Sequence, residues 1–282
     1  MKYGFSFFSF DQDVDFGEAM QHCKNAGFQG VEFVLSHEGN LRMDSTEKEI
    51  LELKRKADDI GIQVITVGDW DSWDNNLATD EPLERSRAMD KVKKQIDVAA
   101  LTGADTALVV PGFTGTPFAS TKLTSYDVAY EYAQKSLLEL SDYAKKANVT
   151  IAIENVWNKF LLSPVEMARF LDEINSPSVK AYFDIGNIIY IGYPEQWIRI
   201  LGDRIHRLQF DDCRADQCGL GMFVDLFEGD VNYPEVMKAI HEIGYDDWAV
   251  IEFFPGYKRY AYQSAYNAKL SLDTLFRENP KK

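Results

Sequence analysis

Short apolar runs rich in β-branched and aromatic residues alternate with longer segments of helical period along almost the whole chain. The expected strands are residues 3–10, 30–35, 63–68, 106–112, 150–156, 179–184, 205–211 and 249–254. The expected helices lie at about 13–26, 46–60, 83–102, 126–147, 164–174, 195–202, 233–243 and 260–277. Strands that are separated by helices pair in parallel, and the helices cover the sheet that they form.

Eight evenly spaced units favour a sheet that closes into a barrel over an open, doubly wound sheet. The first strand is not followed by the glycine-rich fingerprint of an open nucleotide-binding sheet. Glycines in NAGFQGVEF, DIGIQVITV and LTGADTALVV stand between the end of a helix and the next strand, as helix stops do. We therefore predict a single (β/α)8 barrel domain over residues 1–282. Its longest connections, 69–82 and 213–231, fall on the face where barrel active sites lie.

Composition and charge narrow the classes of function. Of the 282 residues 45% are apolar, which is enough for a large core, and 45 acidic against 30 basic residues give a net charge of −15. Such a field repels phosphate backbones, so nucleic-acid binding is not expected. The chain has neither a signal-peptide pattern nor an apolar run of the roughly 20 residues that span a bilayer. We therefore expect a cytoplasmic protein with no membrane segment.

Three carboxylates stand near the ends of strands that are otherwise apolar. Glu154 lies in TIAIENV, Asp184 in VKAYFDIGN and Glu252 in AVIEFFP. An isolated buried carboxylate is costly unless it is paired, protonated or bound to a metal. The ends of barrel strands meet at one mouth, so the repeated pattern favours a shared cation. The alternative is a separate salt bridge from each acid to a lysine or arginine on a neighbouring loop.

Several of these segments resemble a known family. The segments IAIENVWNKFLLSP, YFDIGN, YPEQWIRILGDRI, EGDVNYPEVMKAI and VIEFFP resemble the sugar-phosphate isomerase/epimerase family of xylose-isomerase-like TIM barrels. That family includes ketose 3-epimerases and hexulose-phosphate isomerases, and it holds a metal with Glu, Asp, His and Glu on strands five to eight. The resemblance implies that Glu154, Asp184 and Glu252 are metal ligands. We expect Glu154 and Glu252 to form the catalytic acid/base pair, because strands five and eight are separated around the barrel and can flank a substrate from two sides.

Strand seven departs from the family pattern. The family has a His-x-Lys-Asp ending there, whereas this chain has Gln209 in the histidine position and Asp211 in the lysine position. His206 is no substitute, because an offset of three along a strand puts it on the opposite face. Gln209 offers a neutral carbonyl oxygen, so we expect a divalent metal, Mn or Mg, with Asp211 as an extra ligand. The alternative is a barrel that has lost its metal.

Further residues are candidates for substrate binding. Trp70 and Trp157 lie at or after strand ends, where an aromatic face can pack on the C–H surface of a sugar. Glu32, near the end of the second strand, can accept a hydrogen bond from a hydroxyl. By resemblance, Asn187 and Arg214 stand near family positions that contact substrate. Loop packing of the tryptophans and a structural role for Glu32 remain the alternatives.

Taken together, the residues predict a sugar isomerase or epimerase that acts on a ketose or ketose phosphate. Proton abstraction beside the carbonyl would pass through an enediolate assisted by the metal. Asp211 in place of a lysine favours an unphosphorylated sugar. Two alternatives stay open: a metal-depleted, non-catalytic sugar-binding barrel, and a keto-sugar or keto-inositol dehydratase that uses the same enolisation. The expected partner is a small sugar, and the sequence leaves a homo-oligomer open.

Overall fold

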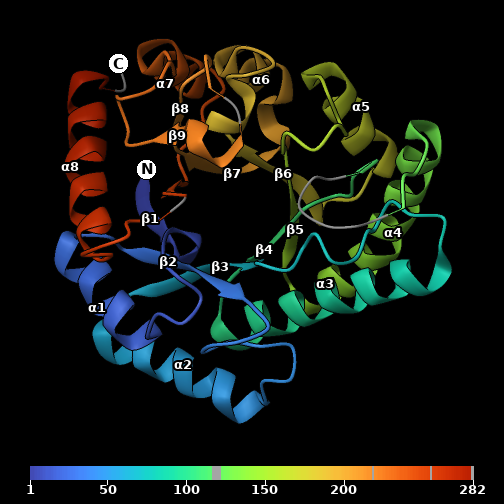
Figure 1. Cartoon of the computed structure of the whole chain (residues 1–282), viewed down its shortest axis with the longest axis horizontal. Helices are drawn as coiled ribbons and strands as arrows, with labels where there is room; N and C mark the ends of the chain where they lie inside the picture. Colours follow the sequence, from blue (N-terminus) through green and yellow to red (C-terminus); the bar gives the residue numbers. More distant parts are fainter. Residues whose placement is uncertain (116–121, 218, 255, 281–282) are drawn as a thin grey trace.

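The computed structural model describes residues 1–115, 122–217, 219–254 and 256–280. Their backbone forms a closed barrel of parallel strands surrounded by helices (Figure 1). The strand order is β1-β10-β7-β6-β5-β4-β3-β2. Each barrel strand therefore lies beside the next barrel strand along the chain, and the last one, β10, pairs with β1. The predicted (β/α)8 barrel is confirmed. No helix in the described part of the chain is long and apolar enough to cross a membrane.

The bounds of the elements agree with the predicted ones to within a few residues at most ends. The barrel strands are β1 (Lys2–Ser6), β2 (Gly30–Leu35), β3 (Gln63–Asp69), β4 (Thr106–Val109), β5 (Thr150–Glu154), β6 (Val179–Asp184), β7 (Ile205–Phe210) and β10 (Trp248–Ile251). The helices are α1 (Phe16–Ala26), α2 (Glu47–Ile60), α3 (Pro82–Thr102), α4 (Tyr126–Ala147), α5 (Pro164–Ile174), α6 (Pro194–Leu201), α7 (Tyr233–Glu242) and α8 (Gln263–Glu278).

Two stretches differ from the expectation. The first strand was expected over residues 3–10, but it ends at Ser6, and Phe7–Ser9 form a 3-10 turn. The Ser6 hydroxyl accepts the Phe8 N–H at 3.3 Å, which turns the backbone out of the strand. After β7, the segment Asp212–Cys213 (β8) pairs antiparallel with Phe223–Val224 (β9). The connection that contains this ribbon, described over 213–217 and 219–231, is called the strand-seven loop below.

Local hydrogen bonding explains where helices begin and end. The side chain of Thr46 accepts the backbone N–H of Glu49, and the Glu49 carboxylate accepts the N–H of Thr46, which makes a capping box at the start of α2. Gly27, Gly61 and Gly103 end α1, α2 and α3 in the left-handed conformation, with φ of 103°, 75° and 81°. These are the glycines that the sequence indicates as helix stops.

Alternation along the strands points every second side chain into the barrel. Ile65, Leu108, Ala152, Tyr182, Trp248 and Val250 form a cluster separate from the core between sheet and helices. Strand pairing sets Glu154 beside Tyr182 and Asp184 beside Gln209. Residues two apart on a strand share a face, so Asp184 faces the barrel interior as Tyr182 does. Glu154 and Gln209 face the interior with them.

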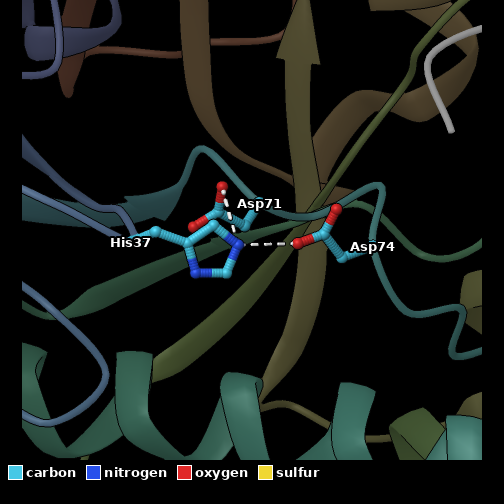
Figure 2. A group of neighbouring side chains, drawn as sticks. All are labelled: His37, Asp71 and Asp74. Carbon is cyan, nitrogen blue, oxygen red and sulfur yellow. Dashed lines mark hydrogen bonds and ion pairs between the residues drawn. The ribbon is translucent and has the colours of Figure 1, made fainter.

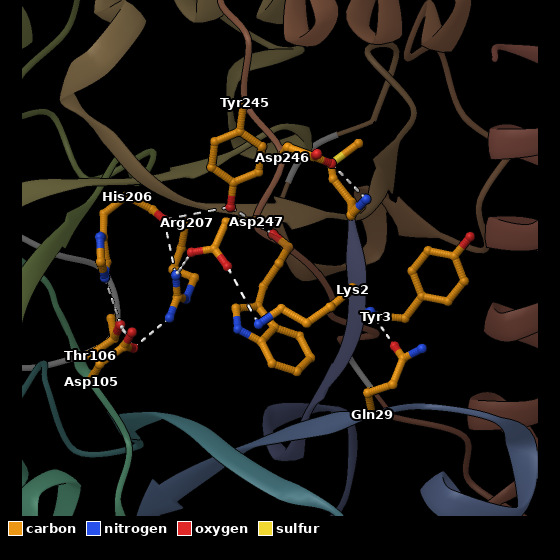
Figure 3. Close-up of polar contacts among 12 residues, drawn as sticks. Lys2, Tyr3, Gln29, Asp105, Thr106, His206, Arg207, Tyr245, Asp246 and Asp247 are labelled. Atoms are coloured by element: carbon orange, nitrogen blue, oxygen red, sulfur yellow. Dashed lines mark hydrogen bonds and ion pairs between the residues drawn. The ribbon is translucent and has the colours of Figure 1, made fainter. Parts of the chain in front are cut away.

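A buried ion-pair group lies at the other end of the barrel (Figure 3). Arg207 on β7 is fully buried, and its guanidinium donates to the carboxylates of Asp105 and Asp247. His206 belongs to the same group, since its Nε2 lies 2.9 Å from Thr106 Oγ1. His206 therefore lies at the end of the barrel opposite to the strand ends that carry the acids.

We expect the double substitution Asp105→Asn, Asp247→Asn to lower the free energy of unfolding by about 3 kcal/mol, because a buried guanidinium loses its counter-charges. Each single change should cost about 1 kcal/mol, since the two side chains are 58% and 41% exposed and water screens them. Urea unfolding followed by circular dichroism measures the difference. Asp203→Asn, at a side chain 97% exposed, is the control. Equal losses in the control and the double variant would contradict the prediction.

Candidate active site

A cavity of about 240 Å³ opens at the C-terminal ends of the barrel strands. Acidic and aromatic side chains dominate its lining, and no lysine, arginine or histidine among the described residues contributes to it. The lining residues are Phe8, Asp69, Trp70, Ser72, Trp73, Leu108, Val110, Glu154, Val156, Trp157, Asp184, Asn187, Asp211, Leu220, Phe223, Glu252 and Phe254. The cavity is therefore negative at one part of its wall and apolar over the rest.

Four of the five acids of the cavity come from strands that adjoin in the barrel, and the fifth, Asp69, is the last residue of β3. Glu154 is the last residue of β5 and Asp184 the last of β6, while Asp211 follows β7 and Glu252 follows β10. The Glu252 N–H donates to Phe210 O at 3.1 Å, which extends the pairing of β10 with β7 up to the cavity. The structure thus brings the three strand-end acids together, as their position in apolar strands predicted.

Asparagine side chains connect the ends of β5 and β6. Asn187, in the 3-10 turn Gly186–Ile188, donates its backbone N–H to Asp184 Oδ1 at 2.7 Å and its Nδ2–H to Glu154 Oε1 at 3.2 Å. Asn155 donates Nδ2–H to Asp184 O at 2.7 Å and accepts the Asp184 N–H at 2.9 Å. The bonds of Asn187 orient the carboxylates of Glu154 and Asp184, and those of Asn155 fix the main chain of Asp184.

Asp211 is enclosed by the turn that follows β6. Its Oδ1 accepts the Gly186 N–H at 2.6 Å, and its carboxyl is hydrogen-bonded to that of Asp184. A Cβ at position 186 would lie 2.4 to 2.6 Å from the carboxyl atoms of Asp211, so the approach requires glycine. A hydrogen bond between two carboxyls needs a proton on one of them.

Burial and mutual repulsion raise the pKa of each acid in the group. Burial, followed by the charges of Glu32 and Asp211, raises the pKa of Glu154 to about 8. Burial is also the main cause that raises the pKa of Asp184, Asp211 and Glu252 well above the ordinary values, and the neighbouring acids add to it. The group is thus stable only with protons or with a cation between the carboxylates.

Gln209 provides an independent indication of a ligand. It is fully buried beside Asp184, and neither its Oε1 nor its Nε2 has a hydrogen-bond partner within the described structure. An unsatisfied buried polar group costs about 1 to 3 kcal/mol, so such groups are rare without a ligand. Gln209 does not itself line the cavity. Its amide oxygen and the carboxylates of Glu154, Asp184 and Glu252 are the oxygen donors that suit a hard divalent ion, so these residues fit the metal implied by the resemblance.

Two expected substrate-binding residues lie away from the cavity. Glu32 is fully buried, and its carboxylate accepts hydrogen bonds from Ser6 Oγ and Tyr182 OH, both at 2.6 Å. Arg214 Nε donates to Glu228 O at 3.2 Å, and its guanidinium lies 3.6 Å from the Glu228 carboxylate. Neither residue lines the cavity. Because partners within the protein occupy both side chains, the structure favours structural roles for them.

Aromatic residues form a continuous part of the wall. Trp70 and Trp157 line the cavity, and so do Phe8 and Phe254, which were not singled out in the sequence. The rings of Phe8 and Trp70 lie 5.0 Å apart and those of Trp70 and Phe254 5.3 Å apart. Phe254 stands two residues after Glu252, and this position after a strand-end acid could have identified it.

A second polar group lies on the loops that follow β2 and β3 (Figure 2). His37 Nε2 is 2.8 Å from Asp74 Oδ2 and 3.5 Å from Asp71 Oδ1. Lys91 of α3 donates to Asp71 O at 2.7 Å and lies 3.8 Å from Asp74 Oδ2. Since Lys91 already supplies a cation here, the group forms an ion-pair network. This network attaches the loop that carries Trp70 to α3.

Comparison with known proteins identifies related chains. Residues 20–275 match the family model described as xylose isomerase-like TIM barrel. An inosose dehydratase of Lacticaseibacillus casei is 23% identical over 264 residues, which cover 86% of this chain and 83% of that protein. A D-psicose 3-epimerase of Clostridium cellulolyticum H10, solved with D-tagatose, has a TM-score of 0.79 and 18% identity over 100% of both chains. The IOLI protein, solved with a zinc atom, has a TM-score of 0.83 and 16% identity, again over 100% of both chains.

Proposed function

The chain belongs to the family of xylose isomerase-like TIM barrels, and from this membership we propose that it is a sugar isomerase or epimerase acting on a ketose. The observation that carries the proposal is that Glu154 and Glu252 line the same cavity. Similar proteins act on sugars or inositol derivatives, as the names D-psicose 3-epimerase and inosose dehydratase indicate. A small sugar is therefore the proposed partner of this chain.

Glu154 and Glu252 are the acid/base pair of the proposal. Glu154 ends β5 and Glu252 follows β10, and β6 and β7 separate these two strands in the barrel, so the glutamates can approach a sugar from two sides. Burial raises the pKa of both carboxyls, that of Glu154 to about 8, which favours uptake of a proton. One glutamate removes the proton from the carbon beside the carbonyl, and the other returns a proton. Return to the same carbon gives an epimer, and return to its neighbour gives an isomer.

The walls of the cavity support binding of an uncharged sugar. Trp70 and Trp157 offer flat apolar faces for C–H groups and exclude water from the acids. The side chain of Asn187 lines the cavity next to Glu154, where its amide can also meet a hydroxyl. Because the described lining includes Asp211 but no cationic side chain, a phosphate group would meet only like charge. We therefore propose an unphosphorylated ketose.

We further propose that Glu154, Asp184, Gln209 and Glu252 hold a divalent metal, Mn or Mg, and that Asp211 is an extra ligand. When bound, the metal supplies positive charge next to the carbonyl and hydroxyl oxygens of the sugar, where negative charge develops. Support comes from the oxygen donors of these residues and from the unsatisfied amide of Gln209. The zinc atom of the IOLI structure belongs to that protein, and an amide oxygen favours harder ions here.

A dehydratase is the second candidate, because the similarity to an inosose dehydratase covers 86% of this chain. The first step would be the same: a glutamate removes a proton beside the carbonyl. In the dehydratase the electron pair left on this carbon does not take up a proton. It forms a double bond to the next carbon and expels the hydroxyl of that carbon, which leaves as water with a proton from the second carboxyl. The two candidates therefore differ in the product and share the same residues.

Incubation with a ketose panel in D₂O separates the candidates. The protein, supplied with Mn²⁺, is tested with D-psicose, D-tagatose, D-fructose, L-ribulose and an inosose, and the products are analysed by NMR and mass spectrometry. We expect one of the ketoses to gain a deuterium beside its carbonyl and to change its configuration or carbonyl position. Loss of water from the inosose would identify a dehydratase. Binding of a sugar without exchange would identify a non-catalytic barrel.

A further inference from the structure

The residue after the acidic group, Asp212, has an unusual set of partners. It is fully buried and does not line the cavity. Its Oδ1 accepts the backbone N–H of Cys213 at 2.9 Å and of Val231 at 3.1 Å. Its Oδ2 accepts the N–H of Phe227 at 2.9 Å and of Gly229 at 3.1 Å. One carboxylate thus serves four backbone donors, which use both of its oxygens fully.

The four donors lie at the two ends of the strand-seven loop. Cys213 begins the loop, whereas Phe227, Gly229 and Val231 belong to its last five residues. A Cβ at position 229 would lie 2.2 Å from Asp212 Oδ1, so the backbone comes as close to the carboxylate as glycine allows. The carboxylate of Asp212 therefore joins the beginning and the end of the loop.

The middle of the same loop forms part of the cavity wall. Leu220 and Phe223 line the cavity together with the strand-end acids. Phe223 pairs with Cys213 in the β8–β9 ribbon, and Met222 O accepts the Arg214 N–H at 2.9 Å. Cys213 and Arg214 directly follow Asp212, so the orientation of the ribbon depends on how Asp212 holds the loop ends.

We propose that Asp212 is a positioning residue for substrate binding. Its carboxylate holds the strand-seven loop in the conformation in which Leu220 and Phe223 close the cavity around a sugar; this rests on the proposed function. A carboxylate is required, because an asparagine would turn one of the two acceptor oxygens into an NH₂ donor that faces two N–H donors. The loss of the negative charge weakens the remaining hydrogen bonds as well.

Trypsin cleavage after Arg214 tests whether Asp212 holds the loop, and it needs no substrate. In Asp212→Asn, measured well below its melting temperature, cleavage at Arg214 should be roughly tenfold faster or more, because the loop opens more often. Cleavage at the exposed Lys159, on the loop after β5, serves as the internal reference and should keep the wild-type rate. Asp216→Asn, at an exposed position of the same loop, is the matched control.

Kinetics with the ketose that the wild type converts best tests the effect on binding. Asp212→Asn should raise KM by about tenfold and change kcat by less than about threefold, since the acids keep their positions. Faster cleavage at Arg214 with an unchanged KM would overturn the proposal, and so would cleavage at the wild-type rate. If Asp212→Asn does not fold, Gly229→Ala replaces it and is expected to show the same two changes. A wild type that converts no ketose overturns the proposed function, while the cleavage rates still decide whether Asp212 holds the loop.

Discussion

Substitution of Glu154 or Glu252 by glutamine is expected to lower kcat by about a hundredfold or more, because an amide can neither take up nor release the proton. Glutamine keeps the shape of the side chain and one oxygen, so the cavity and its aromatic wall should stay intact. Turnover of the best ketose and deuterium incorporation beside its carbonyl should fall in parallel. The double variant should be little slower than the worse single variant, since the two residues act in one proton transfer sequence.

The control for this experiment is Glu139→Gln, at an exposed position on α4 far from the strand ends. Its turnover should equal that of the wild type. Measuring Mn²⁺ content in all variants separates loss of a proton-transfer group from loss of a metal ligand. If turnover survives in both Glu154→Gln and Glu252→Gln, these glutamates are not the acid/base pair.

Substitution of Gln209 by leucine is expected to weaken Mn²⁺ binding by about ten- to a hundredfold, because the buried amide oxygen is lost while the volume is nearly conserved. In Gln209→His, binding should be kept or become tighter, and the preference should move towards Zn²⁺ and Co²⁺, which imidazole suits better. Titration calorimetry with Mn²⁺ and Zn²⁺ measures both effects. Gln134→Leu, on α4 where the amide donates to Glu173 of α5, is the control for the loss of an amide.

The outcome for the wild type decides how the cavity is described. Should the wild type bind no divalent ion while Gln209→His does, the natural protein is a metal-free relative. The proposed isomerase or epimerase activity, which depends on the metal, would then be contradicted. Metal binding by the wild type that Gln209→Leu does not change would show that the carboxylates suffice. Gln209 would then need a different explanation for its unsatisfied amide.

The fold could be predicted because each strand and each helix has its own local pattern. Three of the glycine stops, Gly27, Gly61 and Gly103, end helices in the left-handed conformation as expected. The end of the first strand could not be predicted, because the aromatic residues continue with a strand-like pattern. The backbone turns there because the Phe8 N–H donates to the hydroxyl of Ser6. The pattern of hydrophobic and polar residues gives no indication of such a hydrogen bond.

The depth of a residue in the barrel is also hidden from the sequence. Glu154 and Glu32 give the same signal, a carboxylate within an apolar strand, yet Glu154 lines the cavity and Glu32 is enclosed below it by Ser6 and Tyr182. The difference arises from the stagger of the strands, which only the closed sheet defines. The course of a loop is equally hidden, and for this reason Arg214, expected at the cavity, contacts Glu228 instead.

The close contact of Gly186 with Asp211 restricts the order in which this cavity can be altered. Any side chain at position 186 would overlap the carboxyl of Asp211, which other groups enclose. A larger residue is therefore tolerated at 186 only after position 211 has become smaller, so the two positions form an epistatic pair. A library that varies each of them alone will discard substitutions that a joint library retains, and natural drift towards a different substrate has to pass through the same sequence of steps.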